Sequence, residues 1–400
     1  MDYPFQLRDH GDGVIEMIVS EELGSGHKSV EALKILQKKF NHVILHLESS
    51  ASLNTSFSQV LAGLAEKLLL VAAEDRQVAI DLHGIRRFNE VAQARIWIQG
   101  EKNLAAILEQ FEKMPPLQST GYKLMQMLQN PDVSFEDLEE VIGKDKSLAD
   151  RMLSTSNSAF FVRRLPFENL KSVAAFLGIE GIRQIVLQEI FDQFAELLED
   201  QPEKLLHMRR CAHLSACIGK LIGGDQNLVR KTFFAGLFHD LGALLLCNFN
   251  RQEYGRIYEL VTNGGKTLSE AEREIFGLDH QRLGGILVEK MGLPDYLKTV
   301  AADHHDETCV PTEDLVLPAV MTANGFLNQF VDEMPCFTQY EHFLQVFSER
   351  RQARLSASAA KKISSSTDEA AEEDPFVLPD FFDYLKAELE KFDHSSGTNS

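Results

Sequence analysis

The chain has few cysteines for its length, and none of them forms a recognisable pair. The five cysteines, at positions 211, 217, 247, 309 and 336, are odd in number and include no CxxC spacing. Disulfide frameworks and CxxC redox sites depend on paired, closely spaced cysteines. We therefore expect reduced thiols in the core and no disulfide framework.

Long apolar runs and an excess of basic residues are also missing. No apolar run approaches the roughly eighteen residues of a membrane span, and the first residues lack the basic-then-apolar pattern of a signal peptide. The 40 Lys and Arg residues face 60 Asp and Glu, which gives a net charge of -20 at pH 7. This charge repels nucleic-acid backbones and anionic lipids. We expect a cytoplasmic protein that binds neither nucleic acid nor membrane.

The 400 residues, 44% of them hydrophobic, are enough for more than one domain. Strand-like patterns at residues 14–19, 43–47 and 78–82 alternate with helical periods, which predicts a small α/β domain over residues 1–112. After Met114-Pro115-Pro116 the pattern becomes helical, which predicts an all-α domain over residues 113–354.

The end of the chain differs in composition from the helical domain. Residues 355–375 hold too few large apolar side chains to offset the entropy of ordering, so we expect a disordered linker there. Residues 376–394 are expected to form an amphipathic helix with Phe381, Leu385, Leu389 and Phe392 on one face. Such a helix either packs back on the protein or docks on a partner, and packing back is the more common case.

The pair His239-Asp240, in the run Gly236-Leu-Phe-His-Asp-Leu-Gly242, is the strongest chemical signal. Imidazole and carboxylate groups are preferred ligands of divalent metals such as Zn, Mn, Fe and Ni. Further candidates at intervals suited to one pocket are His213, His280, His304, His305 and Asn324. We expect His207 to be a surface residue.

From about Met114 onward the sequence resembles the HDOD domain, a bacterial signalling branch of the HD metal-phosphohydrolase superfamily. The match runs through Ser154–Ala159, Leu177-Gly178, Gly236–Gly242, Gly277–His280 and His304-His305. The resemblance implies one or two divalent metal ions, Fe, Mn, Zn or Ni. It places one ion on His213, His239 and Asp240, and a second ion on Asp240, His280, His304 and His305.

Two positions depart from the pattern of active relatives. Asn324 stands where a final metal-binding Asp is expected, and an amide removes one negative charge from the site. Ala243 stands where active relatives carry Lys. We therefore expect a signalling adaptor that acts through protein partners, with no catalytic residue assigned. The alternatives are a metal-dependent phosphohydrolase or cyclic-nucleotide phosphodiesterase that uses these ligands, and a pocket that senses a nucleotide or metal without turnover.

The first hundred residues resemble a divergent STAS domain of the anti-sigma-antagonist type. In that family an Asp-Ser-Ser-Gly turn starts a helix, and its first Ser can be phosphorylated by a partner kinase. Here the turn reads Asn54-Thr55-Ser56-Phe57. The resemblance implies Thr55 and Ser56 as phosphoacceptors, whereas the residue types favour a simple helix cap at Asn54 or Thr55.

Overall fold

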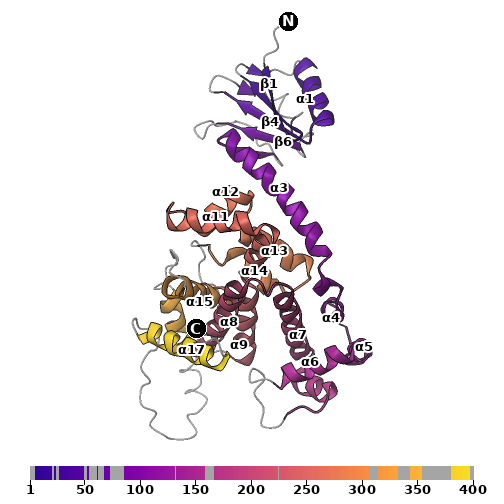
Figure 1. Cartoon of the computed structure of the whole chain (residues 1–400), viewed down its shortest axis with the longest axis vertical. Helices are drawn as coiled ribbons and strands as arrows, with labels where there is room; N and C mark the ends of the chain where they lie inside the picture. Colours follow the sequence, from indigo (N-terminus) through magenta and orange to yellow (C-terminus); the bar gives the residue numbers. More distant parts are fainter. Residues whose placement is uncertain are drawn as a thin grey trace. The chain divides into compact units, whose positions relative to one another are not determined.

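The computed structural model separates the chain into two compact units (Figure 1). One unit is Met1–Asn103 with Phe276–Leu278, and the other is Leu104–Ile275 with Asp279–Ser400. The structure describes residues 5–19, 22–23, 27–48, 52–53, 61, 67–72, 85–130, 132–157, 166–223, 225–306, 314–331, 343–353 and 380–396. The first unit contains a small sheet, and the second is helical in its described part.

The N-terminal sheet has the strand order β1-β2-β4-β6-β7. Strands β1 and β2 pair antiparallel, and every other neighbouring pair in this sheet is parallel. A separate parallel pair joins β3 to β5. The strands are β1 (Phe5–Gly11), β2 (Val14–Val19), β3 (Glu22–Leu23), β4 (His42–Leu47), β5 (Ser52–Leu53), β6 (Leu68–Val71) and β7 (Arg86–Phe88).

Both faces of this sheet are buried, because a helix covers each of them. Leu33 of α1 (His27–Lys39) packs with Met17 on one face, and Ala94 of α3 (Val91–Glu112) packs with Ile44 on the other. Parallel strands covered on both faces read as continuous apolar runs, and all six residues of β2 are buried. The strands predicted at residues 14–19 and 43–47 are confirmed, and the one at residues 78–82 lies outside the described residues.

One charged side chain is fully buried in the N-terminal unit. Glu16, on β2, lies 2.8 Å from His10 Nε2 and 2.7 Å from His46 Nδ1, and Arg8 lies 3.4 Å from the same carboxylate. A buried carboxylate is costly unless its oxygens are hydrogen-bonded or paired. Here both carboxylate oxygens have partners within the protein, so neither is left to bind a ligand.

The second unit is helical throughout its described part, as Figure 1 shows. The predicted all-helical pattern after residue 113 agrees with the described residues. Its elements are η2 (Pro115–Gln118), α4 (Thr120–Met127), α5 (Phe135–Ile142), α6 (Lys146–Ser156), α7 (Leu170–Leu197), α8 (Pro202–Leu221), α9 (Gln226–Phe238), α10 (Leu241–Phe249), α11 (Arg251–Thr262), α12 (Leu268–Phe276), α13 (His280–Lys290), α14 (Asp295–Asp303), α15 (Val316–Phe330) and α17 (Asp380–Ser396).

The C-terminal helix α17 packs back on this unit through its apolar face. Phe381, Leu385 and Leu389 are buried, as the helical periodicity predicts. Arg210 of α8 donates hydrogen bonds of 3.0 and 2.8 Å to the two carboxylate oxygens of Asp393 on α17. The expected linker at residues 355–375 lies outside the described residues.

One segment does meet the length and composition of a membrane span, contrary to the expectation from sequence. Gln226–Phe249 has a mean hydropathy of 1.4 in its most apolar window, and 78% of that window is buried. Two short helices, α9 and α10, make up this segment, with His239 and Asp240 between them. Its apolar character therefore serves the core around these two residues.

Candidate metal centre

His239 and Asp240 lie between two helices, where α9 ends and α10 begins. Gly242 in the first turn of α10 brings this point close to α13. A Cβ atom added at Gly242 would lie 2.0 Å from the carbonyl oxygen of His280 and 2.8 Å from the backbone nitrogen of Gly284. Only glycine allows this approach, and it sets Asp240 beside His280.

The Asp240 carboxylate lies among four imidazole rings. Its Oδ1 atom is 3.2 Å from His304 Nε2 and 3.7 Å from His280 Nε2. Its Oδ2 atom is 3.5 Å from His239 Nε2 and 4.0 Å from His207 Nε2. One carboxylate therefore faces two pairs of histidines, each pair on a different oxygen.

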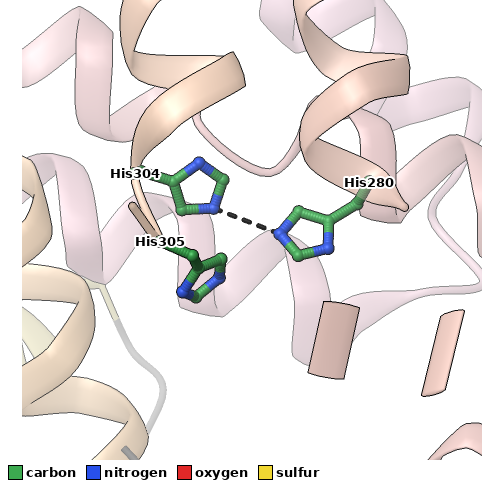
Figure 2. A group of neighbouring side chains, drawn as sticks. All are labelled: His280, His304 and His305. Carbon is green, nitrogen blue, oxygen red and sulfur yellow. Dashed lines mark hydrogen bonds between the residues drawn. The ribbon is translucent and has the colours of Figure 1, made fainter. Parts of the chain in front are cut away.

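Two of these imidazoles, His280 and His304, form a compact group with a further one, His305, as Figure 2 shows. His280 begins α13, and His304 and His305 follow the end of α14. The Nε2 atoms of His280 and His304 are 3.2 Å apart, and one ligand atom from each of the three residues lies within 4.8 Å of the others. His280 and His304 are almost fully buried, and His305 is partly buried.

The Nδ1 atoms fix the orientation of three rings. His239 Nδ1 donates to the carbonyl oxygen of Gly236 at 2.8 Å, and His304 Nδ1 donates to that of Val300 at 3.0 Å. His280 Nδ1 lies 2.5 Å from Glu272 Oε2. When Nδ1 carries the proton, the Nε2 lone pair is free to bind a metal, and such partners are typical of metal-bound histidines.

Glu272, on α12, is a residue of this cluster that was not predicted from the sequence. It makes two contacts with His280. Its Oε2 atom accepts from the His280 backbone nitrogen at 2.8 Å as well as facing the ring, and its Oε1 atom lies 3.3 Å from the hydroxyl of Tyr254. The carboxylate is fully buried. It holds His280 in place and adds negative charge behind the imidazole.

Two ligand atoms of this cluster are buried without a hydrogen bond in the part of the chain that the structure describes. Among the described residues, neither His239 Nε2 nor Asp240 Oδ1 makes a hydrogen bond. Unsatisfied buried polar atoms are rare and call for an explanation. Both atoms are metal-ligand atoms that face the same histidine cluster, so a divalent cation fits the residues present.

The charges of the cluster are strongly coupled. Burial raises the pKa of the Asp240 carboxyl, but the neighbouring imidazoles outweigh burial and hold this pKa well below its ordinary value. Burial lowers the pKa of His280, but the Glu272 carboxylate outweighs it and raises the pKa to about 9. Burial holds the pKa of His305 well below its ordinary value. A cation would therefore displace a proton from His280.

The structure does not bring His213 to this cluster, and it brings His207 there instead. Both lie on α8, six residues apart, so their side chains point about 120° apart around the helix. His207 Nε2 lies 3.0 Å from Asn324 Oδ1, and His207 forms one potential metal-binding group with His239 and Asp240. The expectation that His207 is a surface residue was wrong.

A periodic signal for His207 was present in the sequence. The residues four, seven and eleven positions later, Cys211, Leu214 and Ile218, are all fully buried. His207 therefore continues the apolar stripe of α8 toward the protein interior. His213 lies on another face of the helix, which α17 covers.

The remaining predicted positions fall in different places. Asn324, on α15, is 3% exposed, and its amide oxygen faces His207 in this cluster. Ala243, on α10, is buried. The candidate phosphoacceptors Thr55 and Ser56 lie outside the described residues.

The cluster opens into a cavity of about 210 Å³, lined in part by His207, Asp240, Lys204 and Tyr258. Lys204 Nζ lies 3.0 Å from the hydroxyl of Tyr254 and 4.3 Å from the centre of its ring. Tyr258 at the rim is 44% exposed. The cavity therefore presents one cation and one accessible aromatic ring beside Asp240.

Comparison with known families identifies the helical unit. Residues 114–307 match the HDOD domain family, so the chain contains an HDOD domain. A curated relative is an uncharacterized protein of Treponema pallidum (strain Nichols), 21% identical over 306 residues. The match covers 76% of this chain and 58% of that protein, so this chain spans less than two thirds of the relative's length.

Two solved structures illustrate what this chain is similar to. An HDOD domain protein with unknown function from Geobacter sulfurreducens is 18% identical, with a TM-score of 0.46, and the match covers 73% of this chain and 97% of that one. A provisionally assigned signal transduction protein from Marinobacter aquaeolei VT8 is 14% identical, with a TM-score of 0.46, and the match covers 90% of this chain and 92% of that one.

Proposed function

We propose that this HDOD-containing chain is a signal-transduction adaptor whose helical domain binds one or two divalent metal ions and acts by binding rather than by turnover. The observation that carries the proposal is a pair of buried ligand atoms, His239 Nε2 and Asp240 Oδ1, that make no hydrogen bond within the described part of the chain and lie inside a cluster of imidazoles. A packed protein core rarely tolerates such atoms unless another group binds them.

Two groups of residues would hold the metal. His207, His239 and Asp240 form the first group, with the amide oxygen of Asn324 beside His207. His280, His304 and His305 form the second group, and Asp240 lies between the groups. When bound, a pair of cations can activate water and neutralise phosphate oxygens.

Two side chains argue for binding without hydrolysis. Asn324 supplies an uncharged oxygen where a carboxylate would balance a dication, so the first group carries a single negative charge, on Asp240. Ala243 is buried and offers no cation to a substrate phosphate. The site would therefore keep a metal, or a metal and a ligand, without supplying all that phosphate hydrolysis needs.

A metal-dependent phosphohydrolase remains the second candidate, and one observation favours it. Lys204 lines the cavity beside Asp240, so a cation that Ala243 cannot provide is present on another helix. Tyr258 at the same cavity can stack on a base. A nucleotide phosphate or cyclic nucleotide is the substrate class that this lining fits.

The N-terminal unit would supply the protein-binding function of the adaptor. A STAS-like module fits a small sheet with helices on both faces, and its partners would be signalling proteins in the cytoplasm. Phosphorylation at Thr55 or Ser56 would add negative charge to this module and could change which partner it binds. Phosphopeptide mass spectrometry of protein from its native host would test this modification.

The variant Asn324→Asp separates the two functions. In the wild-type protein, purified without chelator, we expect bound metal and no phosphate release from nucleotides or cyclic dinucleotides. Restoring a carboxylate should tighten metal binding by about tenfold, because a charged ligand replaces a neutral one. Steady phosphate release by the wild-type protein would contradict the adaptor and favour the hydrolase, and absence of metal from both proteins would contradict both.

A further inference from the structure

We propose a second metal site, independent of the HDOD cluster, in which His213 and Cys217 of α8 and Glu388 of α17 bind one thiophilic divalent ion such as Zn²⁺. The three side chains form a separate group whose ligand atoms lie within 4.8 Å of one another. The proposal does not rest on the proposed function, because it shares no ligand with the cluster around Asp240.

The separations of the ligand atoms match those of a metal site. Cys217 Sγ lies 3.7 Å from His213 Nε2 and 3.7 Å from Glu388 Oε2, and His213 Nε2 lies 3.9 Å from Glu388 Oε2. Tetrahedral zinc with ordinary bond lengths places its ligand atoms roughly 3.3–3.6 Å apart. The observed triangle exceeds these values by a few tenths of an ångström, so small side-chain rotations would close it on an ion.

The residue types and their spacing also suit a metal. His213 and Cys217 are four residues apart on α8, so they share one face of the helix. Glu388 approaches from the other helix and completes a set of nitrogen, sulfur and oxygen ligands. Three protein ligands leave a fourth tetrahedral position for water.

Neighbouring contacts position Glu388 and His213. Lys391 donates to Glu388 Oε1 at 2.6 Å, which leaves Oε2 on the side of Cys217. The ring of Phe392 lies 5.1 Å from the ring of His213, and the Arg210–Asp393 ion pair fixes the same helix. The two helices are therefore aligned before an ion binds, which reduces the ordering cost of binding.

Binding has two costs that the geometry identifies. His213 Nε2 lies 3.2 Å from the backbone carbonyl oxygen of Glu388, and this contact must give way to the ion. The thiol of Cys217 must also lose its proton, since burial and the Glu388 carboxylate raise its pKa to about 12. Metal coordination deprotonates thiols, so binding releases one proton to solvent and leaves a metal thiolate.

Cobalt is the probe for this site, because a thiolate bound to Co²⁺ gives a sulfur-to-metal charge-transfer band in the near ultraviolet. We would strip the full-length protein of metal, titrate Co²⁺ anaerobically, and then compete with Zn²⁺. The cluster around Asp240 contains no sulfur ligand among the described residues, so the band reports the second site. Because the cluster around Asp240 would also take up Co²⁺, we expect the band to saturate at the intensity of one thiolate-bound Co²⁺ per chain, with one equivalent sufficient in the Asp240→Ala protein, and Zn²⁺ to abolish it.

Variants show which residues produce the charge-transfer band. Cys217→Ser should abolish it, and Glu388→Gln should weaken Co²⁺ binding by about tenfold or more, as loss of a charged ligand does. Cys211→Ser, a buried cysteine on the same helix, and Asp240→Ala should keep it. Far-ultraviolet circular dichroism would confirm folding, and Glu388→Gln tests the site should Cys217→Ser unfold. No band in the wild-type protein, or a band that survives both Cys217→Ser and Glu388→Gln, would overturn the proposal.

Discussion

Two carboxylates of this chain, Glu16 and Asp240, lie among histidines, and they differ in whether the surrounding side chains hydrogen-bond both carboxylate oxygens. Glu16 of the N-terminal unit has both oxygens within 2.8 Å of an imidazole nitrogen, and Arg8 adds a further contact. Asp240 of the helical unit has an oxygen without a hydrogen bond among the described residues, and so does the neighbouring His239 ring.

The direction of the imidazole nitrogens explains the difference. In the helical unit, His239 and His304 direct Nδ1 to backbone carbonyls and leave Nε2 facing Asp240. In the N-terminal unit, the nitrogens of His10 and His46 nearest Glu16 hydrogen-bond with its carboxylate. The same residue types therefore build a closed structural group in one unit and an open, ligand-binding group in the other. The residue types alone do not distinguish a structural group from a ligand-binding group, but the hydrogen bonds of the imidazole nitrogens do.

The variant Gly242→Ala should have the largest effect on stability and on metal binding, because it disrupts the close approach of α10 to α13 that places Asp240 beside His280. The added Cβ would meet the His280 carbonyl oxygen at 2.0 Å, which forces α10 away from α13. We expect the free energy of unfolding to fall by about 3 kcal/mol or more and the melting temperature to fall by about 6–12 °C. Bound metal should be lost as well. Thermal melts followed by circular dichroism and metal analysis would measure both.

A matched control for that variant lies on α11. Gly255→Ala adds a Cβ that meets nothing within 4 Å, so it should be neutral or stabilise by about 0.5–1 kcal/mol. Equal melting temperatures for the Gly242→Ala and Gly255→Ala proteins would show that the close approach of α10 to α13 does not matter.

The variant Glu272→Gln tests how the open group is oriented. The amide keeps the size of the side chain but removes the charge behind His280. Partners of this kind alter metal affinity by about 10–100-fold. We expect weakening in that range by competition with a fluorescent chelator, and an unchanged affinity would show that Glu272 has no role in metal binding.

The variant Glu16→Gln should have the smallest effect on metal content. Its effect should be confined to the stability of the protein. The amide cannot accept from both His10 and His46 as the carboxylate does. We expect a loss of about 1–3 kcal/mol in the free energy of unfolding by urea denaturation, with metal content unchanged. A fall in metal content would show that Glu16 belongs to a binding site and would remove the contrast with Asp240.

Much of the fold and most of the site could be predicted from the sequence. Periodicity predicted the helical unit and the strand β2, because six consecutive buried residues leave a strong signal. The strand β1 was missed, since its burial pattern is mostly exposed and its sequence, FQLRDHG, is largely polar. His239 and Asp240 were recognisable because they are adjacent in a specific motif.

Side chains that meet only through tertiary packing were harder to predict. Choosing between His207 and His213 required the direction of each side chain on α8, which depends on what covers each face. Glu272 reaches His280 across the turn that joins α12 to α13, and nothing in its local pattern marks it as a partner. The group of His213, Cys217 and Glu388 joins positions more than 170 residues apart in the chain.

Metal content per chain is the measurement that tests the central claim most directly. Wild-type, Asp240→Ala and Glu16→Gln proteins would be purified without chelators or affinity metals and measured by inductively coupled plasma mass spectrometry, each in a Cys217→Ser background to exclude the second site. The account predicts about one or two ions per chain in the parent, the same in Glu16→Gln, and none in Asp240→Ala. A metal-free parent, or equal metal in all three, would contradict it.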